Sequence, residues 1–373
     1  MTVLFCLSHI NKSLQWLWYA EELQKRGITQ IYVIIDIKSG QVYLADDLRA
    51  LGIDVFLLNH SGRGSYVKNI RSVISFIKKY KPDIVHTSLP LGNVYGQMAA
   101  SLCGMKQRIT TCENVSWAHD FKNHKHNIID RFTFSRAKKI IATSAIALNY
   151  LQKNWSFDKS KLLEIHHGLK PEDYNVSEER VEALRHKTAI SRNDFNVGII
   201  ARFEFWKGHE YIVEAANILK DEPRIKFYIF GSKTSYYDEV MKRIGELGLQ
   251  DKIIYGGFVE DTSALYQLFD VHLHVPINEH VETGGITIIE AMMAARPQIL
   301  TRSGYAWQVS KHMHNSYIVP FQDSDAVADA ILWMKDNPGQ AKKLAAQAKE
   351  DAAAFSVKKK ADEHLKLYNE LLK

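Results

Sequence analysis

The chain has 373 residues, 46% of them hydrophobic, which is enough for two domains with a core each. It has no run of 18 apolar residues that could span a membrane, and three cysteines without CxxC spacing favour a reducing, cytoplasmic setting over a disulfide framework. The net charge of +6 is uneven, with +11 up to Lys170 and −5 after it, so the first half is expected to face an acidic partner.

Short β-branched runs alternate with amphipathic stretches from Met1 onward, where the pattern predicts a strand and not a secretion signal. The strands expected in the first half are Val3–Leu7, Ile31–Ile35, Asp54–Leu58, Asp83–Thr87, Arg108–Cys112 and Ile140–Thr143, with helices that include Leu14–Arg26, Tyr66–Tyr80 and Val94–Leu102. The strands expected in the second half are Asn196–Ala201, Lys226–Phe230, Lys252–Tyr255, Val271–Val275, Pro297–Thr301 and Tyr317–Val319. The helices expected there are His209–Lys220, Tyr236–Leu247, Ile286–Ala295, Asp325–Lys335, Gln340–Ala353 and Lys358–Leu372.

This alternation predicts an α/β protein in which helices cover both faces of parallel sheets. The rhythm restarts after a charged stretch over 177–194, so we predict a first domain over 1–175 and a second over 190–355. A final helix over 356–373 would follow, and its return to the first domain is an open possibility. Ligands bind at the carboxyl ends of the strands in such sheets, so a ligand is expected in the cleft between the domains.

Two cations follow the first strand of the second half. That strand ends in a loop with Arg202 and Lys207, and Gly208 then begins a helix. Arginine can hold two phosphate oxygens at once and lysine acts as a mobile point charge, so the pair suits a diphosphate. A solvated surface pair is the alternative interpretation.

The segment Glu282-Thr-Gly-Gly-Ile-Thr-Ile-Ile-Glu290 places two carboxylates on either side of a glycine pair and an apolar helix. If the helix begins near Gly285, its unpaired N–H groups and the positive end of its dipole form an anion site beside Glu282. Glu290 then lies about two helical turns further on. The arrangement suits a ligand with a negative centre flanked by hydroxyl groups, such as a sugar nucleotide.

The motifs over 196–325, taken in their order along the chain, resemble the nucleotide-binding half of the retaining glycosyltransferases of family 4, the glycosyl transferases group 1. The first half resembles the family more loosely, over 81–86 and 140–144. The resemblance implies the GT-B fold, in which two Rossmann-like domains with parallel sheets face each other across a central cleft. The matching positions are Gly198, Arg202, Lys207-Gly208, Phe230-Gly231, Gly256–Val259, Asp270–Pro276, Glu282–Glu290, Pro297, Ser303-Gly304 and Val319–Asp323.

The resemblance also implies roles for individual residues. Arg202 and Lys207 would hold the donor diphosphate, Glu282 would contact hydroxyl groups of the transferred sugar, and Glu290 would bind the ribose. The other donor-binding positions implied are Gly231, Phe258, Val259, Gly284, Gly285, Ile286 and Thr287.

The first half offers candidates for the reacting sugar or the acceptor. The family often places a His or Asp after the strand that here ends at Cys112, and Glu113 and His119 are the candidates at that point. For both residues, the alternative to contact with the sugar or the acceptor is a hydrogen bond that anchors the loop. The chain also departs from the family pattern at Thr283-Gly284 and around Trp307-Gln308, which leaves the identity of the sugar open.

Other features have simpler explanations. Histidine pairs such as His272 and His274 lack a third ligand at suitable spacing, so structural roles are expected and no metal site is predicted. Asp323 precedes an apolar helix and is expected to be its N-cap. The basic, aromatic segment over 117–139 suits an anionic membrane surface, although core aromatics with a solvated basic face would look the same. No nucleic-acid-binding motif accompanies the charge.

Together these features predict a metal-independent, retaining glycosyltransferase of the hexosyltransferase type that works without a cofactor. The expected donor is a nucleoside-diphosphate sugar, with UDP favoured over GDP, and the expected acceptor is a glycan or a lipid-linked acceptor in cell-envelope polysaccharide or glycolipid synthesis. The expected location is the cytoplasm, with peripheral contact to the inner face of the membrane left open. A sugar-nucleotide epimerase on the same fold and a non-catalytic nucleotide-sugar-binding protein are the alternatives.

Overall fold

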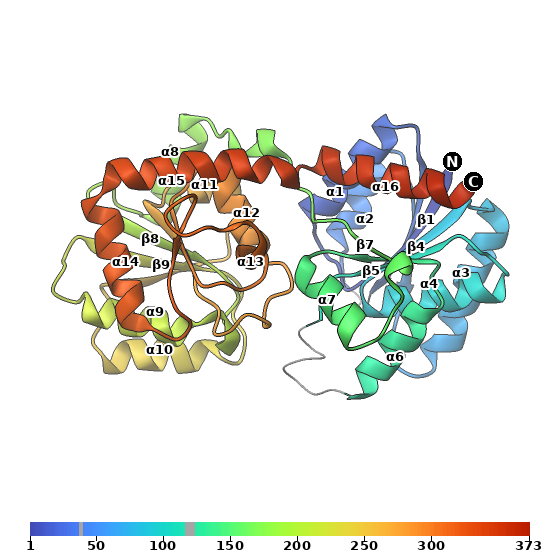
Figure 1. Cartoon of the computed structure of the whole chain (residues 1–373), viewed down its shortest axis with the longest axis horizontal. Helices are drawn as coiled ribbons and strands as arrows, with labels where there is room; N and C mark the ends of the chain where they lie inside the picture. The colour runs from blue at the N-terminus through green and yellow to red at the C-terminus, as the bar shows by residue number, and fades with distance from the viewer. Residues whose placement is uncertain (37–39, 116–123) are drawn as a thin grey trace. The chain divides into compact units, whose positions relative to one another are not determined.

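The structure is a computed structural model that describes residues 1–36, 40–115 and 124–373. The chain divides into two compact units. The first comprises Met1–Lys170 together with Phe355–Lys373, and the second comprises Pro171–Ala354. Each unit is a parallel sheet with helices on both faces, so the α/β class predicted from the sequence is confirmed (Figure 1).

The sheet of the first unit has the strand order β3-β2-β1-β4-β5-β6-β7, and its neighbouring strands pair in parallel. All the strands predicted for this half are present, within one or two residues of the expected ends. The strand β7 is not among the predicted ones, because it is short and only partly buried. The strands are β1 (Thr2–Ser8), β2 (Thr29–Asp36), β3 (Asp54–Asn59), β4 (Ile84–Ser88), β5 (Arg108–Cys112), β6 (Lys139–Ala142) and β7 (Leu162–Glu164).

Helices from both ends of the chain cover this first sheet. On one face α3 (Ser65–Tyr80), α4 (Pro90–Leu102) and α6 (His124–Ser135) pack in sequence, with α7 (Ala145–Lys153) against β6 and β7. On the other face α1 (Leu14–Lys25) packs against both α2 (Tyr43–Ala50) and the C-terminal α16 (Val357–Leu372) (Figure 1). The hydroxyl groups of Tyr19 and Tyr368, 3.1 Å apart and buried, join α1 to α16.

The sheet of the second unit has the strand order β10-β9-β8-β11-β12-β13, again with parallel neighbours. Its strands are β8 (Phe195–Ile200), β9 (Ile225–Phe230), β10 (Ile253–Gly257), β11 (Val271–His274), β12 (Gln298–Leu300) and β13 (Tyr317–Ile318). On one face α9 (His209–Ile218) lies between α10 (Tyr237–Glu246) and α14 (Ser324–Asp336). On the other face lie α8 (Glu178–Thr188), α11 (Thr262–Tyr266), α12 (Ile286–Met293) and α15 (Pro338–Asp351) (Figure 1).

The charged stretch over 177–194 contains a helix, α8, that is not among the predicted helices. Its side chains are mostly polar, but their order favours a helix: Ser177 accepts a hydrogen bond from Arg180 N at the N-terminus, acidic residues fill the first turn and basic residues the last. Arg180 forms a two-pronged ion pair with Asp261, with both distances 2.6 Å, and this ties α8 to the start of α11.

The prediction for Asp323 is confirmed, since its Oδ1 accepts a 2.9 Å hydrogen bond from Ala326 N and caps α14. Across the part of the chain that the structure describes, every helix is too short or too polar to cross a bilayer.

Candidate active site

Loops of the second unit that follow β8, β11 and β12 leave from one edge of its sheet, because these strands are parallel neighbours. The loop after β8 forms a short 3-10 turn, η3 (Phe205–Lys207), and Gly208 then begins α9 with a φ of 76°. A Cβ atom at Gly208 would collide with the carbonyl oxygen of Val275. Only glycine therefore lets this turn lie against the end of β11.

Lys207 and Glu282 form an ion pair that joins the loop after β8 to the loop after β11. The lysine side chain is 16% exposed and the glutamate side chain 11%, so solvent screens the pair only weakly. A 3.1 Å hydrogen bond from Ile277 N to Trp206 O holds the same two loops together. Lys207 and Glu282 are predicted from the sequence to bind different parts of a donor, and in the structure the two side chains also bind each other.

Helix α12 begins at the glycine pair, as the sequence predicts. Gly285 is its N-cap, with a φ of 77°, and no side chain caps the helix there. The first N–H groups of α12 and the positive end of its dipole are thus available to an anion. The loop after β12 supports Gly284 from the other side: Tyr305 N donates to Gly284 O, and a Cβ atom at Gly304 would collide with that oxygen.

His274 also lies in this site, although the sequence pattern predicts a structural role for it. It is the last residue of β11, its Nδ1 lies 3.3 Å from Thr287 Oγ1, and its Nε2 would be 3.3 Å from a Cβ atom at Gly285. Among the described residues no group bonds to that buried Nε2. Burial and the nearby charge of Lys207 lower the pKa of His274 well below its usual value, so the ring is neutral at pH 7. Its place at the carboxyl end of a strand is the signal that could have identified it.

Glu290 lies in α12 and is held by two tyrosines. Its Oε2 accepts a 3.1 Å hydrogen bond from Tyr266, and its Oε1 lies 3.3 Å from the hydroxyl of Tyr174. Burial raises the pKa of Glu290, while the two tyrosine hydroxyls oppose that shift. The same Tyr266 hydroxyl lies 3.1 Å from Thr287 O, so the two acceptors share one hydrogen and the tyrosine lies between the second carboxylate and the backbone of the helix start. Neither tyrosine was singled out in the sequence.

The remaining predicted donor residues follow the neighbouring strands. Arg202 follows β8; its side chain is 63% exposed, and its guanidinium lies 3.7 Å from Glu204. Gly231 follows β9, where a Cβ atom would collide with Ala201 O. Phe258 follows β10 with 70% of its surface exposed, and Val259 beside it is partly buried. The structure therefore pairs Lys207 with Glu282 and leaves Arg202 and Phe258 extended into solvent.

Of the predicted residues in the first unit, Glu113 is described and His119 lies outside the described residues. Glu113 follows β5 directly, and its Oε1 accepts a 2.7 Å hydrogen bond from Ser88 Oγ. Its Oε2 lies 3.2 Å from His167 Nε2. Glu113 is thus anchored at the carboxyl edge of the first sheet and remains a candidate for binding.

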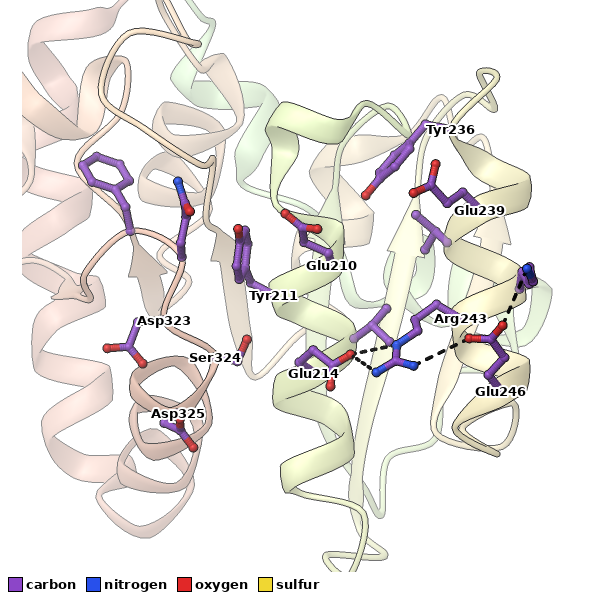
Figure 2. A pocket seen from close by; sticks show the side chains of 15 residues that line it. Glu210, Tyr211, Glu214, Tyr236, Glu239, Arg243, Glu246, Asp323, Ser324 and Asp325 are labelled. Carbon is purple, nitrogen blue, oxygen red and sulfur yellow. Dashed lines mark hydrogen bonds and ion pairs between the residues drawn. The ribbon is translucent and has the colours of Figure 1, made fainter.

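A separate cavity of about 750 Å³ lies in the second unit beside α9, α10 and the start of α14 (Figure 2). Most charged residues of its lining are carboxylates, and Arg243 of α10 pairs with Glu214 of α9 at 2.7 Å and with Glu246 of its own helix at 3.6 Å (Figure 2). An acidic lining repels a diphosphate, so this cavity is a poorer candidate for an anion site than the Lys207 region. Its labelled carboxylates are Glu210, Glu214, Glu239, Glu246, Asp323 and Asp325 (Figure 2).

Comparison with known families matches both halves of the chain. The family described as glycosyl transferases group 1 matches residues 180–351, and glycosyltransferase family 4 matches residues 19–173. The proposed glycosyltransferase EpsD of Bacillus subtilis is 24% identical over 309 residues, which cover 80% of this chain and 79% of that protein. An Escherichia coli UDP-Gal:alpha-D-GlcNAc-diphosphoundecaprenol alpha-1,3-galactosyltransferase is 21% identical over 304 residues, or 79% of this chain and 77% of that enzyme.

Solved structures share the fold over nearly the whole chain. Anabaena HepE in complex with UDP superposes with a TM-score of 0.84 at 18% identity and covers 99% of this chain and 100% of that chain. A glycosyltransferase from Rickettsia africae gives a TM-score of 0.81 at 24% identity, with 100% and 98% covered.

Proposed function

Because the chain belongs to the glycosyl transferases group 1 and has the GT-B fold, we propose that it is a retaining enzyme that moves a sugar from a nucleoside-diphosphate sugar to a glycan or lipid-linked acceptor. The observation that carries this proposal is the shielded Lys207–Glu282 ion pair beside the uncapped start of α12. The cation and the helix start suit a diphosphate, and the carboxylate suits sugar hydroxyl groups.

The chemistry that we propose follows from these charges. When the sugar–phosphate bond breaks, negative charge builds up on the leaving diphosphate and positive charge on the anomeric carbon. Lys207, Arg202 and the N–H groups at Gly285 and Ile286 would stabilise the negative charge, a task for which other enzymes use a divalent metal. Attack from the face that the diphosphate leaves, with a donor phosphate oxygen taking the acceptor's proton, would retain the configuration.

The donor and acceptor are proposed by class. We favour a UDP-sugar over a GDP-sugar, since HepE was solved with UDP and with UDP-glucose, and the Escherichia coli relative is named for UDP-Gal. Glu290 would bind the ribose, and Phe258 with Val259 would hold the base. The same relative acts on a diphosphoundecaprenol-linked sugar, which supports a cell-envelope acceptor for this chain.

UDP is expected to raise the midpoint of thermal unfolding of the wild-type protein, more than GDP does, with the same shift in the presence of EDTA. The reason is that a ligand bound only by the folded state stabilises it, by about 2.7 kcal/mol at a hundred times its Kd. The measurement is a thermal-shift titration with both nucleotides, followed by a radiolabel-transfer assay from UDP-sugars.

The alternatives give different results in the same experiments. Conversion of the donor sugar without any acceptor would identify an epimerase. Stabilisation by UDP with no transfer to any glycan or lipid-linked acceptor would identify a binding protein. An acceptor product with inverted anomeric configuration by NMR would contradict the retaining mechanism, and a shift abolished by EDTA would contradict the metal-independent one.

We also propose that the first unit contacts an anionic membrane through α6. Three apolar side chains are exposed on this helix: Ile128 by 69%, Ile129 by 48% and Phe132 by 46%. The guanidinium of Arg136 lies 4.6 Å from the centre of the Phe132 ring, so a positive charge accompanies the apolar surface. The part of the predicted membrane segment before residue 124 lies outside the described residues, and α6 carries the proposal.

Replacing Phe132 with aspartate is expected to lower the fraction of protein that sediments with phosphatidylglycerol vesicles several-fold. The substitution removes apolar surface and adds a charge that anionic lipid repels. Val67→Glu on α3 is the matched control, since Val67 is 60% exposed on another helix of the unit. Equal sedimentation of both variants and wild type would exclude α6 as the contact.

A further inference from the structure

A small, partly open cavity lies at the carboxyl edge of the first sheet. It has room for about one water-sized group, roughly 10 Å³. Its walls come from segments far apart in the sequence: α1, the ends of β4, β5 and β6, the segment after β7, and the C-terminal helix α16. The residues that line it are Trp16, Tyr19, His86, Thr111, Glu113, Ile141, Thr143, Ile165, Lys360 and His364.

The start of α16 is fixed at this edge by backbone contacts. Leu169 N donates to Phe355 O at 2.9 Å, and Val357 N donates to Leu169 O at 2.7 Å. Gly168 permits the approach, since a Cβ atom there would stand 2.6 Å from the Cα of Val357. The first turn of α16 therefore places Lys360 at the carboxyl edge of the first sheet, where Glu113 follows β5.

Most polar groups in the cavity wall already have partners. His86 uses both ring nitrogens, with Tyr368 at 2.7 Å and Thr111 at 2.8 Å. His364 Nδ1 lies 2.7 Å from the carbonyl oxygen of Lys360, and Thr143 donates to Cys112 O at 3.2 Å. These groups shape the wall and leave little bonding capacity for a ligand.

Lys360 differs from these groups, because no hydrogen-bond acceptor among the described residues binds its ammonium group. Its ammonium faces the rings of Tyr19, 4.7 Å from the ring centre, and Trp16, at 5.4 Å. Among the described residues no carboxylate lies close enough to it for an ion pair. Burial lowers the pKa of Lys360, and the nearby charge of Glu113 opposes that shift. Its three N–H donors thus enter the cavity with no hydrogen-bond acceptor of their own among the described groups.

Whereas Lys360 supplies hydrogen-bond donors to the cavity, Glu113 supplies acceptors. Each of its oxygens has one partner, Ser88 or His167, and each carboxylate oxygen can accept more than one hydrogen bond. One positive and one negative side chain therefore line a space the size of a single oxygen atom. Their charges balance, so the group that fits between them is neutral and both donates and accepts, as a hydroxyl group does.

We propose that Lys360 and Glu113 bind one hydroxyl group of a neutral sugar acceptor, which donates to the carboxylate and accepts from the ammonium. The inference rests on the proposed function and deepens it by naming the acceptor class and a residue from the C-terminal helix. An acceptor that brought a carboxylate or phosphate group to this point would upset the charge balance.

The test is binding of the methyl glycosides of glucose, galactose and mannose, with glucuronate as the anionic comparison, measured by saturation-transfer NMR on protein saturated with UDP. Wild-type protein is expected to bind at least one neutral glycoside more tightly than glucuronate. Lys360→Met and the isosteric Glu113→Gln are each expected to weaken that binding about tenfold or more, the loss of one hydrogen bond to a charged group. Lys359→Met, exposed in the same turn, is the matched control and is expected to bind like wild type.

A stability measurement separates binding from a structural role. Methionine in place of a buried ammonium removes a charge that is costly to bury, so Lys360→Met is expected to keep or raise the unfolding midpoint while it loses the glycoside. If Lys360→Met does not fold, the glycoside affinity of Glu113→Gln still decides whether the pair binds the hydroxyl group. Failure of every neutral glycoside, tighter binding of glucuronate, or glycoside binding unchanged in both variants would overturn the inference. In each case, the UDP-induced thermal shift tests the proposed function independently.

Discussion

Replacing Lys207 with methionine is expected to lower the turnover number about 10²–10³-fold. The lysine side chain is only 16% exposed, is paired with Glu282, and lies at the sheet edge from which α12 starts. A preorganised donor that meets developing negative charge contributes about 3–4 kcal/mol to catalysis, whereas an exposed ion pair contributes at most about 1 kcal/mol to stability. The measurement is the steady-state rate of transfer from a UDP-sugar at saturating donor and acceptor.

The matched control is Lys335→Met, which breaks the more exposed pair between Lys335 and Glu222, 2.8 Å apart on the same unit. That variant is expected to transfer at close to the wild-type rate. A Lys207→Met enzyme that keeps more than about a third of the wild-type turnover would show that its ammonium does not stabilise the leaving group.

Folding must be separated from catalysis in this experiment, because Lys207→Met leaves the carboxylate of Glu282 buried without its counter-charge. Breaking a buried pair by removing one partner costs about 3–5 kcal/mol, whereas removing both partners is often close to neutral. The double variant Lys207→Met with Glu282→Gln is therefore expected to recover much of the lost stability and none of the lost turnover. Recovery of turnover in the double variant would assign Lys207 the lesser role of neutralising Glu282.

The predictable part of the fold rests on strands that are buried on both faces. Continuous β-branched runs such as Ile31–Ile35 can be located from composition alone, because a parallel strand covered by helices has no polar face. β7 has only three residues and one buried side chain, so it carries too little of this signal. The helix α8 was missed for the opposite reason: its stability comes from caps, charges and the Arg180–Asp261 pair, and its apolar face is small.

The predictable part of the candidate site consists of positions set by local sequence. The Gly284-Gly285 pair before an apolar run predicts where α12 starts, because a helix start with glycine is a local property of the chain. The partners across the site could not be predicted in this way. Lys207 and Glu282 are 75 positions apart, and Tyr174 and Glu290 are 116 apart, so only the strand order brings them together.

The stability of the protein is expected to fall steeply as the pH drops from about 6.5 to about 4, because several histidines are buried in neutral form. Burial lowers the pKa of His209 and of His272 to about 4, and that of His364 to about 3, against an ordinary value of 6.5. Below pH 6.5 these histidines bind protons in the unfolded chain, whereas in the folded chain they stay neutral until the pH approaches their lower pKa values. Stability is thus fully present above 6.5, and each histidine removes up to about 1.4 kcal/mol per pH unit below it.

His209 offers the sharpest measurement of this effect. Its ring is buried and stacks on Phe203, with centres 4.8 Å apart and an interplanar angle of 17°. His209→Phe keeps the stacking and cannot be protonated, so urea unfolding of this variant at several pH values is expected to give a slope shallower by about 1.4 kcal/mol per pH unit. His186→Gln, at an exposed position on α8, is expected to leave the slope unchanged. If His209→Phe and wild type lose stability in parallel between pH 6.5 and 4.5, the buried ring of His209 is protonated in the folded state as readily as in the unfolded chain, and the acid sensitivity must then come from other groups.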